Sequence, residues 1–124
     1  MPQHQMFFVN LPVDDLARSR AFFTQLGYAF REDFCDADTL CVHLGPGVHA
    51  MLLRREFFAR FHDRPTAPPG SVGTLLCVSA DSREAVDALV DRAVLAGGED
   101  VRAADHGFMY GRSFADPDGH VWEV

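Results

Sequence analysis

The chain has 124 residues, which is one domain's worth and enough to bury a hydrophobic core. Hydrophobic residues make up 48% of it and charged residues 23%, as in ordinary globular proteins, and its apolar runs are too short for a transmembrane helix. The net charge is −7 and the basic residues are scattered, so we expect no nucleic-acid surface and no membrane partner.

The first half of the chain reads as one βαβββ unit. Residues 6–13 alternate in a strand pattern with apolar side chains on both faces, and Asp14 or Asp15 is the expected N-cap of a helix that ends at Gly27. Short strands are then predicted near 28–35, 39–44 and 48–54, the last two joined through the turn Gly45-Pro-Gly47.

The second half repeats this order after a proline-rich linker. The linker covers residues 64–71, which separates a first unit over 1–63 from a second unit over 72–124 within a single domain. We expect a strand over 72–79 and then a helix capped by Asp81, with Glu84 as its capping-box partner. The helix ends at Gly97-Gly98, and strands follow near 99–103, 107–115 and 120–124.

The last two strands carry the strongest site candidates. Asp116-Pro-Asp-Gly119 predicts a tight turn, because proline presets φ and glycine accepts a positive φ. A four-residue loop places Arg112 opposite Glu123 on one face, with Tyr110 beside the arginine, whereas a bulge at the turn shifts this pairing by one residue. Trp122 then faces away from Glu123 and packs against a helix.

Both ends of the chain resemble one superfamily. The hairpin Phe114–Val124 and the opening strand and helix Phe8–Gly27 are similar to those of the vicinal oxygen chelate proteins, which include glyoxalase I, bleomycin-resistance proteins and extradiol dioxygenases. The resemblance implies an α+β fold in which two paired βαβββ modules form a curved mixed sheet with a concave cleft. It also implies a homodimer.

The positions that bind metal in this superfamily carry few ligands here. In the metal-dependent members, four equivalent strands each supply a His, Glu or Gln. The resemblance carries these positions onto Phe8, Leu52, Leu75 and Glu123. A divalent cation needs several oxygen or nitrogen ligands and only Glu123 offers one, so we expect no metal and no other cofactor.

Glu123 has three candidate roles. It could line a ligand pocket, pair with Arg112 as a structural ion pair, or act as a catalytic general acid–base. Strand parity and the resemblance together predict a ligand-binding set that faces the cleft: Phe8, Asn10, Leu52, Leu75, Tyr110, Arg112 and Glu123.

The histidines and cysteines offer less. His43 and His49 flank a turn and could face each other across the hairpin, but no third metal ligand is visible and parity relative to Leu52 predicts the helix-covered side. Cys35, Cys41 and Cys77 form no CxxC pair, and residues 1–5 lack the pattern of a signal peptide. We therefore expect reduced thiols in a cytoplasmic protein.

Taken together, the sequence predicts a glyoxalase/bleomycin-resistance-like protein that binds a small organic ligand in an apolar cleft. Arg112 and Tyr110 are expected to orient an anionic or carbonyl group of this ligand. The alternative is a metal-dependent lyase or isomerase of the lactoylglutathione lyase type, with zinc or nickel bound. A third possibility is a structural module whose cleft is filled by its own side chains. Fold does not transfer chemistry, so the sequence leaves the choice between binding and catalysis open.

Overall fold

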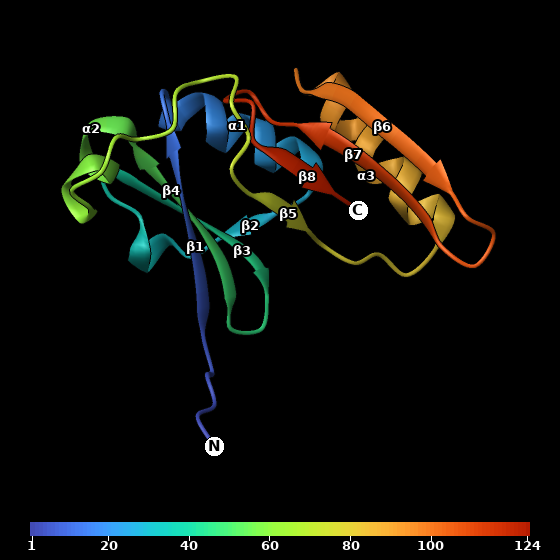
Figure 1. The fold of residues 1–124 in the computed structure, drawn as a ribbon, viewed down its shortest axis with the longest axis horizontal. Coiled ribbons are helices and arrows are strands. Elements are labelled where there is room, and N and C mark those ends of the chain that lie inside the picture. The colour runs from blue at the N-terminus through green and yellow to red at the C-terminus, as the bar shows by residue number, and fades with distance from the viewer. The chain divides into compact units, whose positions relative to one another are not determined.

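The computed structural model describes all 124 residues, which divide into two compact units, Met1–Thr66 and Ala67–Val124 (Figure 1). We call them module one and module two. The division falls inside the predicted linker 64–71. No helix in either module has the length and apolar character needed to cross a bilayer.

Module one begins with the predicted strand and helix. The Asp15 carboxylate accepts a hydrogen bond from the Arg18 N–H at 3.1 Å and so caps the helix, and Gly27 ends it with a φ of 101°. The segment predicted as a strand over 28–35 is a strand for only two residues, which pair with the next strand, and a 3-10 helix follows. The elements are β1 (Phe7–Val13), α1 (Leu16–Leu26), β2 (Ala29–Phe30), η1 (Glu32–Phe34), β3 (Thr39–Gly45), β4 (Val48–Arg54), α2 (Arg55–Phe58) and η2 (Ala59–Phe61).

The sheet of module one has the strand order β1-β4-β3-β2, in which only the β1–β4 pair is parallel. Helix α1 packs on one face of this sheet, and Phe22 and Phe23 on its inner side are 1% exposed. The sheet residues that form this core with them are Leu11, Val13, Leu40, Val42, Ala50 and Leu52.

Module two repeats the same topology. Its elements are β5 (Leu75–Cys77), α3 (Arg83–Leu95), β6 (Glu99–Asp105), β7 (Tyr110–Ala115) and β8 (Val121–Glu123), and the strand order is β5-β8-β7-β6. The N-cap is Ser82 and not the predicted Asp81, because Ser82 is the extended residue whose hydroxyl accepts the Ala85 N–H at 3.0 Å. Strand β5 is shorter than predicted, since its partner β8 offers only three paired residues.

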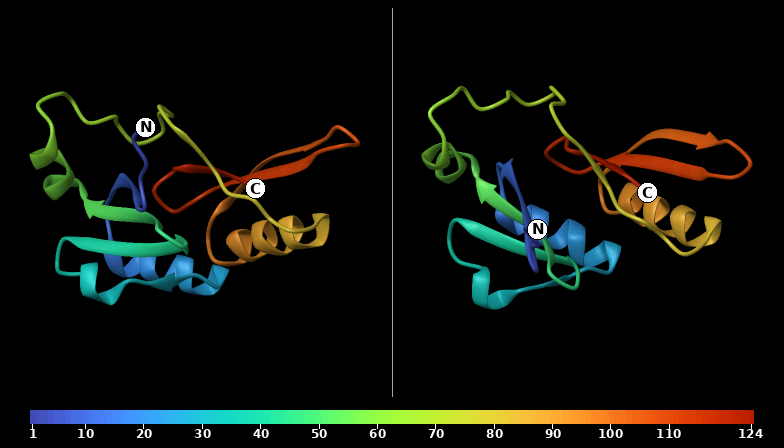
Figure 2. Two further views of the ribbon diagram at one scale, coloured as in Figure 1. Left: turned by 90° about the horizontal axis from the view of Figure 1, so that it is seen from below. Right: turned by 60° about the horizontal axis from the view of Figure 1, so that its bottom comes forward.

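Helix α3 covers one face of the second sheet (Figure 2). Val86, Val90 and Ala93 are buried along it, while Phe114 and Trp122 from the hairpin stack with an interplanar angle of 4°. Trp122 is 1% exposed, which confirms that it points to the core and away from Glu123. The opposite face of the sheet carries no helix of this module, and the candidate site lies there.

The strand and helix that open the two modules are related by a common offset in residue number. The N-caps Asp15 and Ser82 are separated by the same offset that relates Phe8 to Leu75 and Asn10 to Cys77. Equivalent strands therefore occupy equivalent places, and the predicted βαβββ duplication is confirmed within each module.

Candidate ligand-binding site

The turn between β7 and β8 fixes the register of the whole site. Asp116 is 5% exposed, and its Oδ1 accepts the backbone N–H groups of Asp118 and His120, both at 3.0 Å. Its Oδ2 accepts the indole N–H of Trp122 at 3.1 Å. Burial raises the pKa of Asp116 against the opposing influence of these partners. The carboxylate thus holds residues 116–120 as a five-residue loop, one residue longer than the simplest reading of the turn.

This longer loop moves every cross-strand pair by one position. Ser113, and not Arg112, stands opposite Glu123, while Arg112 exchanges backbone hydrogen bonds with Val124 at 2.8 and 3.1 Å. The predicted Arg112–Glu123 pair is therefore wrong, and the shift is the one that a bulge at the turn would cause. Because side chains alternate along a strand, Arg112 and Tyr110 project toward α3 instead of joining Glu123.

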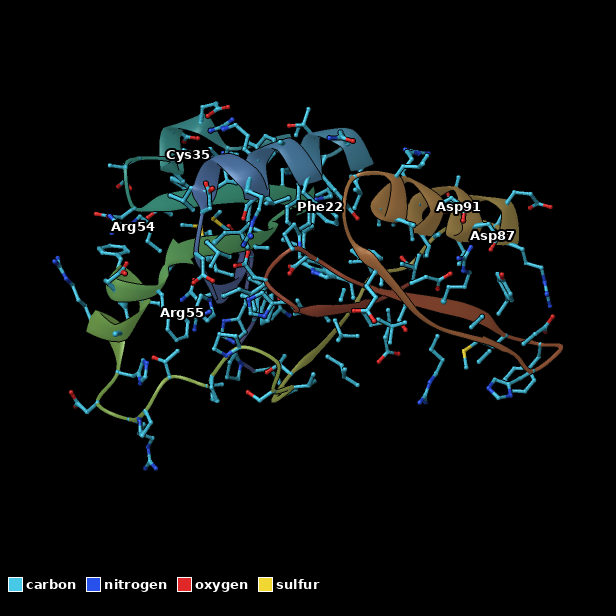
Figure 3. The ribbon with its side chains drawn as sticks, turned by 90° about the horizontal axis from the view of Figure 1, so that it is seen from above. Phe22, Cys35, Arg54, Arg55, Asp87 and Asp91 are labelled. Carbon is cyan, nitrogen blue, oxygen red and sulfur yellow. The ribbon has the colours of Figure 1, made fainter.

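Arg112 is instead the centre of an acidic cluster under the helix. Its guanidinium donates to Asp87 and Asp91, which Figure 3 shows on α3, each at 3.1 Å, and to Asp100 at 2.9 Å. Burial opposes the charge of Arg112, yet these three hydrogen bonds raise the pKa of its guanidinium above the ordinary value. The Tyr110 hydroxyl donates to Asp87 at 2.5 Å, and hydrogen bonds from Tyr110 and Arg112 lower the pKa of Asp87. Both predicted ligand-orienting groups are thus engaged within the protein.

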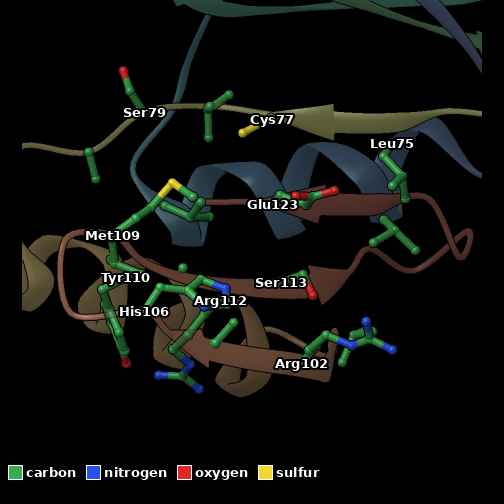
Figure 4. A pocket seen from close by; sticks show the side chains of 18 residues that line it. Leu75, Cys77, Ser79, Arg102, His106, Met109, Tyr110, Arg112, Ser113 and Glu123 are labelled. Carbon is green, nitrogen blue, oxygen red and sulfur yellow. The ribbon is translucent and has the colours of Figure 1, made fainter.

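A different set of polar side chains crosses the open face of the sheet. Arg102 on β6 pairs with Ser113 on β7, Ser113 pairs with Glu123 on β8, and Glu123 pairs with Cys77 on β5. Directly paired residues project to the same face, so the four side chains form one line across all four strands (Figure 4). We call this line the polar row. Ser113 is 7% exposed, and neither Arg102 nor Glu123 has a hydrogen bond or ion pair from its side chain to another residue.

The polar row lies in a cavity of about 680 Å³ that is formed by module two alone. Its remaining lining is largely apolar, with Leu75 and Val121 on one side of the row and Ala104 and Gly111 on the other. At Gly111 an added Cβ would lie 3.4 Å from the Val124 carbonyl oxygen, which is an ordinary contact distance. Further residues that line the cavity are Val78, Ser79, Ala80, Val86, Val101, His106, Met109, Tyr110, Arg112 and Val124.

Four of the predicted site residues line this cavity, while Cys77, Ser113 and Arg102 of the polar row were not predicted. The four are Leu75, Glu123, Tyr110 and Arg112, of which the last two have their polar ends turned to Asp87. Cys77 had a signal, since it lies two residues after Leu75 on the same strand. Ser113 and Arg102 had none, because their place depends on the length of the turn and on a register shift in β6 between Asp100 and Arg102.

The predicted residues of module one divide between the two faces of its sheet. Phe8 is 40% exposed and Asn10 is exposed, on the face opposite α1. Leu52 is 0% exposed and pairs with Leu11 among the core residues under the helix, so its prediction as a cleft residue is wrong. By the repeat, Met51 is the residue equivalent to Glu123, because Met51 pairs with Asn10 as Glu123 pairs with Cys77.

The two histidines of β3 and β4 face each other, as predicted. His43 Nδ1 and His49 Nε2 are 3.5 Å apart, and the His49 ring stacks on Phe8 with centroids 5.2 Å apart. Both lie on the face opposite Leu52, which is the face without α1, so the expected helix-covered side is wrong for the same reason as for Leu52. His49 is 1% exposed, and burial together with His43 lowers its pKa.

The side chains do not fit a metal centre of the kind the resemblance implies. Strand pairing puts Met51 in the place expected for Leu52, so the four positions are Phe8, Met51, Leu75 and Glu123. Only Glu123 offers an oxygen or nitrogen ligand. No group of three or more His, Cys, Asp or Glu side chains is placed to hold a metal ion. A single carboxylate does not satisfy the coordination of a divalent cation.

Comparison with protein families identifies one superfamily. The family model described as Glyoxalase/Bleomycin resistance protein/Dioxygenase superfamily matches residues 5–124. No curated protein sequence matches the chain significantly.

Solved structures of similar fold include several from bacteria. A hypothetical protein from S. aureus has a TM-score of 0.83 and 24% identity, covering 98% of this chain and 93% of its own. A glyoxalase-related enzyme from Fulvimarina pelagi has a TM-score of 0.82 and 25% identity, with coverages of 98% and 87%. A lactoylglutathione lyase from Agrobacterium tumefaciens has a TM-score of 0.72 and 21% identity, with coverages of 99% and 93%. These likenesses are likenesses of fold.

Proposed function

Because this chain belongs to the glyoxalase/bleomycin resistance protein/dioxygenase superfamily, we propose that it binds a small organic ligand in the cavity of module two. The observation that carries the proposal is the cavity itself, with about 680 Å³ of space, apolar walls and one row of polar groups. Pockets for small molecules have this size and this composition, since apolar walls supply affinity and a few polar groups fix orientation.

Glu123 serves this ligand as a hydrogen-bond acceptor. The structural ion pair with Arg112 is wrong, because that guanidinium binds three aspartates on the helix side of the sheet. The Glu123 carboxylate and the Ser113 hydroxyl project into the cavity from neighbouring strands. A ligand group that donates hydrogen bonds can meet both, while Leu75 and Val121 offer it apolar contact beside them.

We further propose that binding does not use a divalent metal. This part rests on the donor set, in which Phe8, Met51 and Leu75 stand with a single carboxylate at the four equivalent positions. The competing function is a metal-dependent lyase or isomerase of the lactoylglutathione lyase type. A relative of that name shares the fold at 21% identity, which carries no chemistry to this chain.

Ligand titration with a blocked-cavity variant tests the proposal. Leu75 is 58% exposed at the cavity, and Leu95 is 85% exposed on α3 outside it, so each can be replaced by tryptophan without disturbing a core. Binding of benzylamine or para-toluate, followed by NMR titration, should be lost in Leu75→Trp and kept in Leu95→Trp. Equal binding by both variants would place the ligand elsewhere and refute the proposal.

Elemental analysis of the purified protein separates the two functions. We expect no stoichiometric metal. Stoichiometric zinc or nickel that disappears in Glu123→Gln, together with a lyase activity on a thiol adduct that disappears with it, would overturn the metal-free proposal and favour the enzyme.

We also propose a homodimer. The exposed phenylalanines support it, since Phe7 and Phe61 are each 63% exposed and Phe108 is 89% exposed in the single chain. Light scattering at several concentrations measures the mass, and a monomer throughout would refute this proposal.

A further inference from the structure

We infer that the ligand is amphoteric, a compact molecule with a cationic donor group at one end and an anionic group at the other. This inference rests on the proposed function and names its ligand class. The cationic end would bind Glu123, the anionic end would bind Arg102, and the apolar body would lie between them over Ser113.

The first support is the order of charges along the polar row. Arg102, Ser113 and Glu123 are direct neighbours on three successive strands, so their side chains leave the same face of the sheet. Neighbouring strands are about 4.8 Å apart, which places the backbone of Arg102 roughly 10 Å from that of Glu123. The Ser113 hydroxyl lies between the two charges (Figure 4).

The second support is that the charged groups of Arg102 and Glu123 have no partner, whereas most arginines of the protein are paired with a carboxylate. Arg112 binds three aspartates, Arg83 binds both carboxylate oxygens of Asp105, and Arg31 binds both carboxylate oxygens of Asp33. The Arg102 guanidinium and the Glu123 carboxylate have no partner in the protein, although they share one row. Charges of both signs are therefore available to a single ligand.

The third support is the apolar floor beside the row. Leu75 and Val121 flank it on one side, and Ala104 and Gly111 on the other. Apolar surroundings strengthen a hydrogen bond to a charged group and penalise a charge that is left unpaired. Arg102 is exposed and Glu123 is half-buried, so a ligand with one charge gains one charge-assisted hydrogen bond where an amphoteric ligand gains two.

Three probes with the same benzene ring test the inference. Para-aminomethylbenzoate carries an ammonium and a carboxylate at opposite ends, benzylamine carries the ammonium alone, and para-toluate carries the carboxylate alone. The wild-type protein should bind para-aminomethylbenzoate with a Kd roughly tenfold lower than either of the others, as expected for one additional charge-assisted hydrogen bond.

Neutral variants assign each end. In Glu123→Gln the affinity for para-aminomethylbenzoate should fall to that for para-toluate, and in Arg102→Gln it should fall to that for benzylamine. Glu84→Gln and Arg92→Gln remove the same charges from exposed positions of α3 and should change no Kd. Isothermal titration calorimetry measures all three compounds on all five proteins.

The outcomes separate this inference from the proposed function. Equal Kd values for the three probes, with binding still lost in Leu75→Trp, would overturn the amphoteric ligand and leave the cavity function intact. Binding of none of the probes to the wild-type protein would overturn both. Equal losses in the row variants and in the two control variants would show a general charge effect and also refute the inference.

Discussion

Replacing Asp116 by alanine should destabilise the protein more than any other exchange in its turn. The side chain is 5% exposed and accepts three hydrogen bonds, two from backbone N–H groups and one from the Trp122 indole at 3.1 Å. Trp122 is 1% exposed, so its N–H finds no water when the carboxylate is removed. An unsatisfied buried donor costs about 1–3 kcal/mol, and the two loop donors are closer to solvent, which gives a total loss of about 3 kcal/mol.

Trp122 also provides the assay, because it is the only tryptophan of the chain. Its emission should shift to longer wavelength when the denaturant exposes it, and the midpoint then reports the free energy of unfolding. Asp118→Ala removes a carboxylate from the same turn and should cost less than about 1 kcal/mol. Equal losses for Asp116→Ala and Asp118→Ala would refute the conclusion that Asp116 organises the loop.

Asp116→Asn adds a test by pH. Burial holds the pKa of Asp116 above its ordinary value of 3.8, so the folded state binds a proton more readily than the unfolded chain. Between these two pKa values the stability contributed by this group falls as the pH rises. Wild type should therefore lose stability relative to Asp116→Asn across that window, and a constant difference would contradict the buried charge.

Three further predictions follow from the site and its supports. Arg112→Gln should lower the melting temperature by roughly 5 °C at low salt and by less at high salt. Arg102→Gln, on the other face of the same sheet, should leave the melting temperature nearly unchanged. Equal shifts of the two variants in calorimetry would contradict the stabilising role of the acidic cluster. The pKa of His49 in the folded protein is depressed below its ordinary 6.5, so its contribution to stability should be lost as the pH falls from 6.5 through the folded pKa. His49→Phe should remove this part of the pH dependence of unfolding. Gly47→Ala should lower the free energy of unfolding by about 2 kcal/mol or more, since φ is 71° and the new Cβ would meet backbone. Gly45→Ala meets nothing and should cost under about 1 kcal/mol. Equal midpoints of the two variants in chemical denaturation would exclude strain at Gly47.

The fold was accessible from the sequence because its signals are local. Asp15 and Gly27 mark the ends of the first helix through their own side chain and φ, and Gly97, with a φ of 104°, follows the end of α3. The one-residue error at Asp81 has a simple cause: Asp81 and Ser82 are both good N-caps, and only the backbone conformation decides between them.

The face of the sheet that each strand residue occupies was harder to predict from the sequence. Alternation shows which residues of a strand share a face, but only contacts with other elements show which face that is. Strand β4 carries apolar side chains on both faces, so its pattern does not distinguish Leu52 from Met51. Assigning Leu52 to the cleft therefore carries His43 and His49 to the wrong side of the sheet with it. The pairing of β4 with β1 and β3 decides the face of all three, and the pattern of no single strand shows that pairing.

The position of Arg112 depended on the length of one turn. A side chain that binds two amides of its own loop lengthened that turn by a residue, and this effect is not visible in turn propensities alone. A signal for the true partners of Arg112 was present, since Asp87 and Asp91 are spaced one helical turn apart on α3.

The two modules have the same topology but differ in what their open faces present. In module one, the line equivalent to the polar row runs through Asn10, Met51 and Cys41, and the arginine next to it is held by Asp33. Under the proposed function, recognition of the ligand is confined to one of two copies of the same topology. Random mutagenesis should reveal this division of labour as hydrophobic exchanges tolerated at Met51 and rejected at Glu123.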